Sequence, residues 1–169
     1  MKTIICGKGG SGKSTITALL AKTMTARGHS VLVIDTDESN QGLHRQLGLE
    51  APDDFMEYIG GKQAFVQQMM EKMPKGEPLS LFEDDWSLAD VPEQYLSKQD
   101  GLGLIAIGKI HTFGEGCACP LGALSKNLIS RITTRMPIIY LSTPKPESNT
   151  LVAVLKRDVT RSCGRRAFI

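Results

Sequence analysis

Short apolar runs alternate with segments of helical spacing along the first two thirds of the chain. The apolar runs have the length of strands buried on both faces, and they occupy residues 2–6, 31–34 and 102–107. Between the first two runs, apolar side chains recur at helical spacing at Ile16, Leu19, Leu20 and Met24. Gly28 follows, where a helix-ending glycine is expected. Strand, helix and strand of these lengths form one βαβ unit, which predicts an α/β fold with a mainly parallel sheet.

The rest of the chain carries weaker signals. Residues 50–100 show no sustained period, although residues 65–70 have the composition of a short helix and residues 83–85 that of a solvated charge run. Helical spacing predicts a helix over residues 121–132. Further on, the pattern predicts a short strand over residues 138–141. An amphipathic helix capped by Ser148 is then expected to run through Leu151, Val154, Leu155 and Val159.

Composition narrows the class of protein. A chain of 169 residues with 41% hydrophobic and 22% charged residues is expected to form one globular domain. The net charge of +2 gives no reason to expect a nucleic-acid partner. No apolar run approaches the length of a membrane span and no signal peptide precedes Lys2, so a cytoplasmic chain is expected. Four cysteines in a reducing compartment favour metal or redox chemistry over disulfides.

A glycine-rich loop joins the first predicted strand to the first helix. It fits the phosphate-binding pattern G-x-x-x-x-G-K-[ST] and consists of Gly7, Lys8, Gly9, Gly10, Ser11, Gly12, Lys13, Ser14 and Thr15. Its glycines allow backbone N–H groups to close on a phosphate. Lys13 supplies a charge to the β- and γ-phosphates, and the Ser14 hydroxyl suits Mg²⁺. Strand, loop and helix together predict a nucleotide site.

Two carboxylates follow the second strand. Asp35 and Asp37 stand at its carboxyl end, where the functional groups of parallel sheets collect. A carboxylate there can orient a water and assist proton transfer, or it can anchor a water of the Mg²⁺ shell. The sequence leaves both roles open. Asp35 is a weak candidate for the Mg²⁺ shell.

A second candidate site is the pair Cys117 and Cys119 in the loop after the third strand. Two thiolates in a C-x-C pattern form half of a tetrahedral site, which a symmetric dimer completes. Such ligands suit Zn²⁺, Cu⁺ or Ni²⁺, and a redox pair or two inert thiols are the alternatives. Cys6, on a strand, is expected to be a small core residue.

Lys8, before Gly-Gly-x-Gly-Lys-Ser, resembles the extra lysine of the "deviant Walker A" ATPases, the group of MinD, ParA and the nitrogenase iron protein. The resemblance implies a three-layer P-loop NTPase fold and a homodimer that sandwiches ATP and Mg²⁺. It also implies that Lys8 reaches the partner's phosphates and that Asp37 orients the attacking water. Lys8, Lys13 and Asp37 are then the catalytic residues.

Within that group, Gly-Glu-Gly-Cys-x-Cys-Pro at residues 114–120 is similar to the CooC family of nickel-insertion ATPases, which mature carbon monoxide dehydrogenase. The resemblance runs from Met1 to about Arg135. It implies that Cys117 and Cys119 bind Ni²⁺, or Zn²⁺ in its place, at the dimer interface. The implied function is a metallochaperone ATPase whose partner is a client nickel enzyme.

The resemblance ends after the P-loop ATPase portion at residues 1–135. Family members continue with a strand and Asp-Thr-x-Ala-Gly, which residues 136–169 lack. Read one base earlier, with permitted synonymous codons, that tail spells an apolar strand and the missing motif. We therefore hypothesise an out-of-frame tail and a fold truncated at its C-terminus. In the family, the strand before that motif is expected to lie beside the strand at residues 2–6. Here either residues 137–141 fill this vacant strand position or a sheet edge stays open. We expect this chain to bind nucleotide weakly and to hydrolyse it poorly.

Two other functions fit the same loop. A MinD/ParA-like positioning switch would act through a partner or membrane and would be indifferent to the cysteine pair. A non-enzymatic remnant would lack ATPase activity at any protein concentration. An ordinary P-loop kinase leaves Lys8 without a role.

Overall fold

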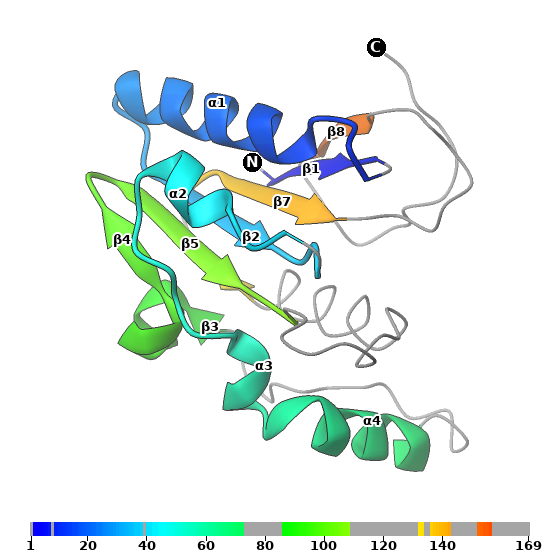
Figure 1. The fold of residues 1–169 in the computed structure, drawn as a ribbon. Helices are drawn as coiled ribbons and strands as arrows, with labels where there is room; N and C mark the ends of the chain where they lie inside the picture. Colours follow the sequence, from blue (N-terminus) through cyan, green and yellow to red (C-terminus); the bar gives the residue numbers. More distant parts are fainter. Residues whose placement is uncertain are drawn as a thin grey trace.

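The computed structural model describes residues 2–7, 9–38, 40–72, 86–108, 132–133, 136–142 and 152–156. Across these residues the main sheet has six strands in the order β4-β5-β2-β7-β1-β8 (Figure 1). The four inner strands are mutually parallel: β5 (Leu102–Ala106), β2 (Val31–Asp35), β7 (Ile138–Ser142) and β1 (Lys2–Cys6). The edge strands β4 (Ser97–Gln99) and β8 (Val152–Lys156) are antiparallel to their neighbours. A parallel pair, β3 (Trp86–Ser87) and β6 (Ile132–Thr133), lies apart from this sheet.

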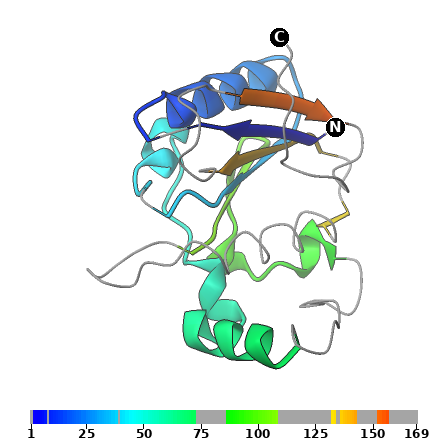
Figure 2. The same ribbon diagram turned by 90° about the vertical axis from the view of Figure 1, so that its right-hand side faces the viewer.

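Helices cover both faces of the sheet, as Figures 1 and 2 show. One face carries α1 (Lys13–Ala26) and α2 (Leu43–Leu47), whose cluster includes the odd-numbered β2 residues Val31 and Val33. The other face packs the even-numbered β2 residues Leu32 and Ile34 against α3 (Phe55–Tyr58) and Phe65 of α4 (Gly61–Lys72). The short 3₁₀ helices η2 (Leu88–Asp90) and η3 (Glu93–Tyr95) lie on this second side. The predicted three-layer α/β fold is confirmed.

The first helix forms where the sequence places it, but only Leu20 and Met24 of its apolar stripe pack against the core. Thr17, Ala18 and Ala21 are buried, whereas Ile16 and Leu19 are 37% and 62% exposed. Small side chains let the helix lie close to the sheet. Gly28 adopts φ 82°, the left-handed conformation predicted after the helix end. The predicted helix at residues 65–70 lies within α4.

The predicted strand at residues 138–141 exists as β7, and it occupies the position between β1 and β2. Leu32 N–H donates to the Pro137 carbonyl at 2.9 Å, and Thr36 N–H donates to the Leu141 carbonyl at 3.0 Å. The hydroxyls of Thr36 and Tyr140 lie 2.9 Å apart. Of the two expected outcomes for the vacant strand position, the structure shows the filled one.

The predicted helix from Ser148 through Val159 is wrong over its described part. Residues 152–156 form β8, which pairs antiparallel with β1 along its whole length. A short apolar run such as Val-Ala-Val-Leu does not distinguish strand from helix by its periodicity. The backbone N–H and C=O groups at the edge of β1 favour pairing with another strand. The helix expected over residues 121–132 lies outside the described residues except for Ile132, which begins β6.

Within the described part of the chain, every helix is too short or too polar to span a lipid bilayer.

Candidate functional site

The glycine loop connects the carboxyl end of β1 to the first turn of α1. Gly10 and Gly12 adopt φ 77° and 84°, a conformation that only glycine enters without strain. A Cβ atom added at Gly9, Gly10 or Gly12 would meet no heavy atom within 4 Å, so the face of this loop is open. Gly12 is the N-cap of α1 and has no side chain to cap it. An open ring of backbone at a helix N-terminus suits an anion such as a phosphate.

Lys13 and Asp37 form a buried ion pair beside this loop. The distance from Lys13 Nζ to Asp37 Oδ2 is 3.3 Å, and the two side chains are 4% and 7% exposed. Lys13 starts α1 and Asp37 follows β2, so the pair joins the helix to the carboxyl end of the sheet. Lys13, which the sequence predicts to contact phosphates, is therefore paired with Asp37, which is predicted to orient the attacking water.

Asp35 ends β2 and is buried, with contacts on both sides. Its Oδ1 accepts a hydrogen bond from Asp37 N–H at 3.0 Å. Its Oδ2 lies 3.3 Å from Asn40 Nδ2, and the same nitrogen lies 2.9 Å from Ser14 Oγ. One amide group therefore links the predicted Mg²⁺ ligand on α1 to the predicted Mg²⁺-shell carboxylate on β2.

These oxygens fit a magnesium ion bound with a nucleotide. Mg²⁺ prefers hard oxygen ligands and keeps several waters, and here a hydroxyl and a carboxylate both face one amide nitrogen. Ser11 Oγ in the loop is buried and has no hydrogen-bond partner among the described residues, as expected of a group that contacts a ligand. Ser14 and Asp35 are the residues that would hold the ion, directly or through water.

Most of the predicted phosphate site is therefore assembled in one place, and three predicted residues are not described. Lys8, Cys117 and Cys119 lie outside the described residues, so their roles stay predictions. Within the described ranges no three His, Cys, Asp or Glu side chains gather as a metal site. Cys6 is buried in β1, as expected of a core residue.

Sequence reasoning missed Asn40. Its signal is the spacing Asp35-x-Asp37-x-x-Asn40 directly after a buried strand, which places a third polar side chain at the same sheet edge. Only the fold shows that this side chain turns back to Ser14 across the start of α1.

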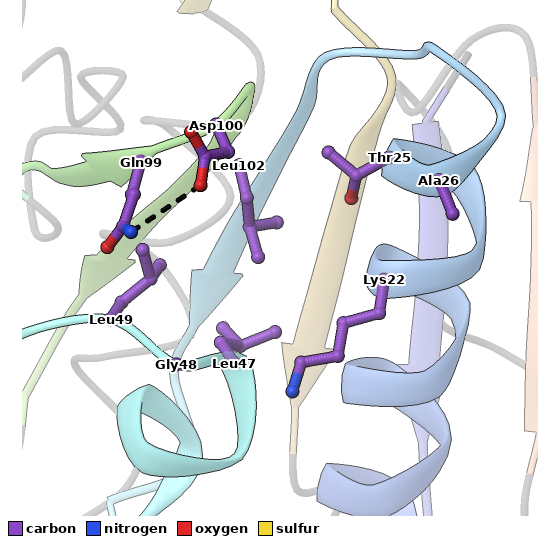
Figure 3. Close-up of a pocket in the computed structure, with 9 residues that line it drawn as sticks. All are labelled: Lys22, Thr25, Ala26, Leu47, Gly48, Leu49, Gln99, Asp100 and Leu102. Carbon is purple, nitrogen blue, oxygen red and sulfur yellow. Dashed lines mark hydrogen bonds between the residues drawn. The ribbon is translucent and has the colours of Figure 1, made fainter.

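A separate pocket of about 340 Å³ lies at the other end of α1 (Figure 3). Lys22, Thr25 and Ala26 line it from the helix, and Leu102 lines it from the first residue of β5. The helix from Lys13 to Ala26 is about 20 Å long, so this pocket is remote from the glycine loop. It is no part of the phosphate site.

Comparison with known proteins agrees with the geometry of the loop. The family profile described as "CobQ/CobB/MinD/ParA nucleotide binding domain" matches residues 2–166. An uncharacterized ATP-binding protein of Methanocaldococcus jannaschii is 53% identical over 132 residues, which cover 78% of this chain and 53% of that protein. The carbon monoxide dehydrogenase accessory protein CooC of Rhodospirillum rubrum is 30% identical over 136 residues, which cover 80% of this chain and 51% of that protein.

A shorter match joins the chain to a second kind of metal-related protein. A cytosolic Fe-S cluster assembly factor of Phaeosphaeria nodorum is 45% identical over 47 residues, which cover 28% of this chain and 16% of that protein. The chain spans about half the length of the curated relatives that match most of it.

Proposed function

Because this chain belongs to the CobQ/CobB/MinD/ParA nucleotide binding family, we propose that it binds Mg²⁺-ATP at the glycine loop and uses ATP hydrolysis to deliver nickel to a client enzyme. The observation that carries the ATPase part is the constellation of Lys13, Asp37, Asp35 and Ser14 around the open loop. Cation, carboxylates and hydroxyl converge at the carboxyl edge of a parallel sheet, where such sheets bind ligands.

In this proposal the phosphates draw Lys13 away from Asp37. The Lys13 ammonium leaves the Asp37 carboxylate and binds the more highly charged phosphates. Backbone N–H groups of the loop surround the β-phosphate. Asp37 is then available to accept a hydrogen bond from a water near the γ-phosphate. The Lys13–Asp37 pair thus holds both groups in the site until a nucleotide binds.

Hydrolysis then follows as an in-line transfer. The water oxygen bonds to the γ-phosphorus while the bond to the oxygen bridging the β-phosphate breaks, and ADP leaves with that electron pair. Asp37 takes up the proton that the water loses. Lys8 of a second copy would stabilise the developing charge, as an arginine finger does. Bound at Ser14 and Asp35, Mg²⁺ would supply charge neutralisation on the β- and γ-phosphates.

The nickel part of the proposal rests on the cysteine pair and on the relatives. Cys117 and Cys119 of two copies supply four thiolates, a complete soft-metal site at a symmetric interface. The similarity to a carbon monoxide dehydrogenase accessory protein supports carbon monoxide dehydrogenase as client. Nickel as cargo is what the CooC-like cysteine motif at residues 114–120 implies. The shorter match to Fe-S cluster assembly factors also supports metal handling over a positioning switch. ATP moves the metal only if the two dimer states differ in metal affinity.

The test is nickel stoichiometry by equilibrium dialysis of the full chain, with and without Mg²⁺-ATP. We expect about one Ni²⁺ for two chains, a change in affinity when Mg²⁺-ATP is added, and loss of binding in C117S/C119S. The matched control is C163S, which removes a cysteine outside the pair. Equal nickel binding in all three proteins contradicts metal delivery and favours the positioning switch.

A further inference from the structure

Asn40 is held at four points between the glycine loop and the end of β2. Its Nδ2 donates to Ser14 Oγ at 2.9 Å and to Asp35 Oδ2 at 3.3 Å. Its Oδ1 accepts from Gly42 N–H at 3.2 Å, and its own backbone N–H donates to the Asp37 carbonyl at 3.0 Å. These bonds use both amide hydrogens and the amide oxygen of one side chain.

The orientation of this amide follows from its partners. The opposite orientation would set Oδ1 against the carboxylate of Asp35 and the NH₂ group against the backbone N–H of Gly42. Both contacts would be repulsive, since an oxygen would face an anion and a donor would face a donor. The NH₂ group therefore points at Ser14 and Asp35.

We propose that Asn40 is a positioning residue for the magnesium ion: it aims the oxygens of Ser14 and Asp35 at a common point. This inference rests on the proposed binding of Mg²⁺-ATP at the glycine loop. A hydroxyl or carboxylate oxygen has more than one lone pair, so the hydrogen bond from Asn40 does not by itself block binding of the ion or its waters. Mg²⁺ demands near-ideal octahedral geometry, which makes its affinity sensitive to the direction of its ligands.

Asn40 also links the proposed magnesium ligands to Asp37, the carboxylate proposed to orient the attacking water. Its backbone bond to the Asp37 carbonyl and its side-chain bond to Asp35 hold both ends of the Asp35-Thr36-Asp37 segment. Groups that orient metal ligands typically change metal affinity 10- to 100-fold when removed. We expect a loss of this size in Mg²⁺ affinity, with nucleotide binding in the absence of Mg²⁺ nearly unchanged.

The decisive variant is Asn40→Ser. A serine oxygen can still accept from Gly42 N–H in the same tight turn, but its side chain is too short to reach Ser14 and Asp35. Asn40→Ala removes the turn bond as well and serves as the second variant. Gln46→Ala is the matched control, because it removes an exposed amide from the neighbouring helix α2.

The readout is the binding of a fluorescent ADP analogue to the full chain, first with EDTA and then over a MgCl₂ titration. We expect the half-saturating Mg²⁺ concentration to rise at least tenfold in N40S and N40A and to stay constant in Q46A. Binding in EDTA should change less than twofold. Unchanged or lower half-saturating Mg²⁺ in N40S overturns the inference, as does an equal loss of binding with and without Mg²⁺.

The two proposals fail separately. A wild-type chain without Mg²⁺-dependent nucleotide binding contradicts the proposed function, and the inference falls with it. If N40S has the same half-saturating Mg²⁺ concentration as the wild type, the inference about Asn40 is contradicted and the proposed function is not.

Discussion

Replacing Asp37 with asparagine should lower the free energy of unfolding of the nucleotide-free chain and raise its affinity for ADP. The substitution keeps the shape of the side chain and removes the anion that faces Lys13 at 3.3 Å. Lys13 then keeps its buried charge but loses the carboxylate that faces it in the wild type. A bound phosphate then no longer competes with the Asp37 carboxylate for Lys13, so the free energy of unfolding and the affinity for ADP should change in opposite directions.

The magnitude follows from the geometry of the pair. At 3.3 Å and an effective dielectric constant of about 20, the two charges attract by about 5 kcal/mol. The asparagine oxygen restores about 2 kcal/mol as a hydrogen bond to a charged group. We therefore expect the nucleotide-free unfolding free energy to fall by about 3 kcal/mol, within the range measured for broken buried pairs.

The assay is urea unfolding of wild type and D37N, without nucleotide and with saturating Mg²⁺-ADP. Removal of the competing carboxylate should tighten ADP binding at least tenfold. With Mg²⁺-ADP, the deficit of D37N, meaning the amount by which its free energy of unfolding lies below that of the wild type, then shrinks by about 1.4 kcal/mol. The control is E50Q, which removes a negative charge from an exposed residue. The reasoning is refuted if the deficit of D37N is the same with and without Mg²⁺-ADP, since Lys13 would then gain nothing from the phosphates.

Three further substitutions test the loop and the sheet. Gly12→Ala forces a Cβ into the left-handed conformation, which should lower the free energy of unfolding by about 1 kcal/mol. The added methyl on the open face of the loop should also weaken nucleotide binding measured by calorimetry, and unchanged binding places the phosphates elsewhere. Tyr140→Phe should lower the free energy of unfolding in urea by about 1 kcal/mol through loss of the hydroxyl contact with Thr36, and an unchanged free energy of unfolding contradicts this contact. Asp54→Ala should cost about 2 kcal/mol, because its carboxylate accepts backbone N–H groups from the start of α3 and from Gly108; a loss below about 0.5 kcal/mol contradicts this.

The sequence predicts the central βαβ unit well because buried parallel strands and a glycine loop leave strong local patterns. Val31–Asp35 is buried along its whole length, and so is the neighbouring strand β5. Lys13, Ser14, Asp35 and Asp37 were predicted at one edge for the same reason. Their arrangement at strand ends follows from topology, which the motif largely determines.

Other features depend on contacts between distant residues. Thr17, Ala18 and Ala21 are more buried than the larger apolar residues of α1, since close packing on the sheet selects small side chains. The run Val152–Lys156 becomes a strand because β1 offers an edge, which no local pattern reveals. Asn40 reaches Ser14 over a separation of 26 residues, so its role appears only in three dimensions.

The most direct measurement of the central claim is calorimetric titration of the full chain with Mg²⁺-ATP, beside two lysine variants on the same helix. Lys13→Ala removes the cation at the glycine loop, whereas Lys22→Ala removes an exposed cation in the remote pocket. We expect one ATP site for each chain, lost in K13A and intact in K22A. Binding that survives in K13A, or that disappears in K22A instead, would contradict a nucleotide site at the glycine loop.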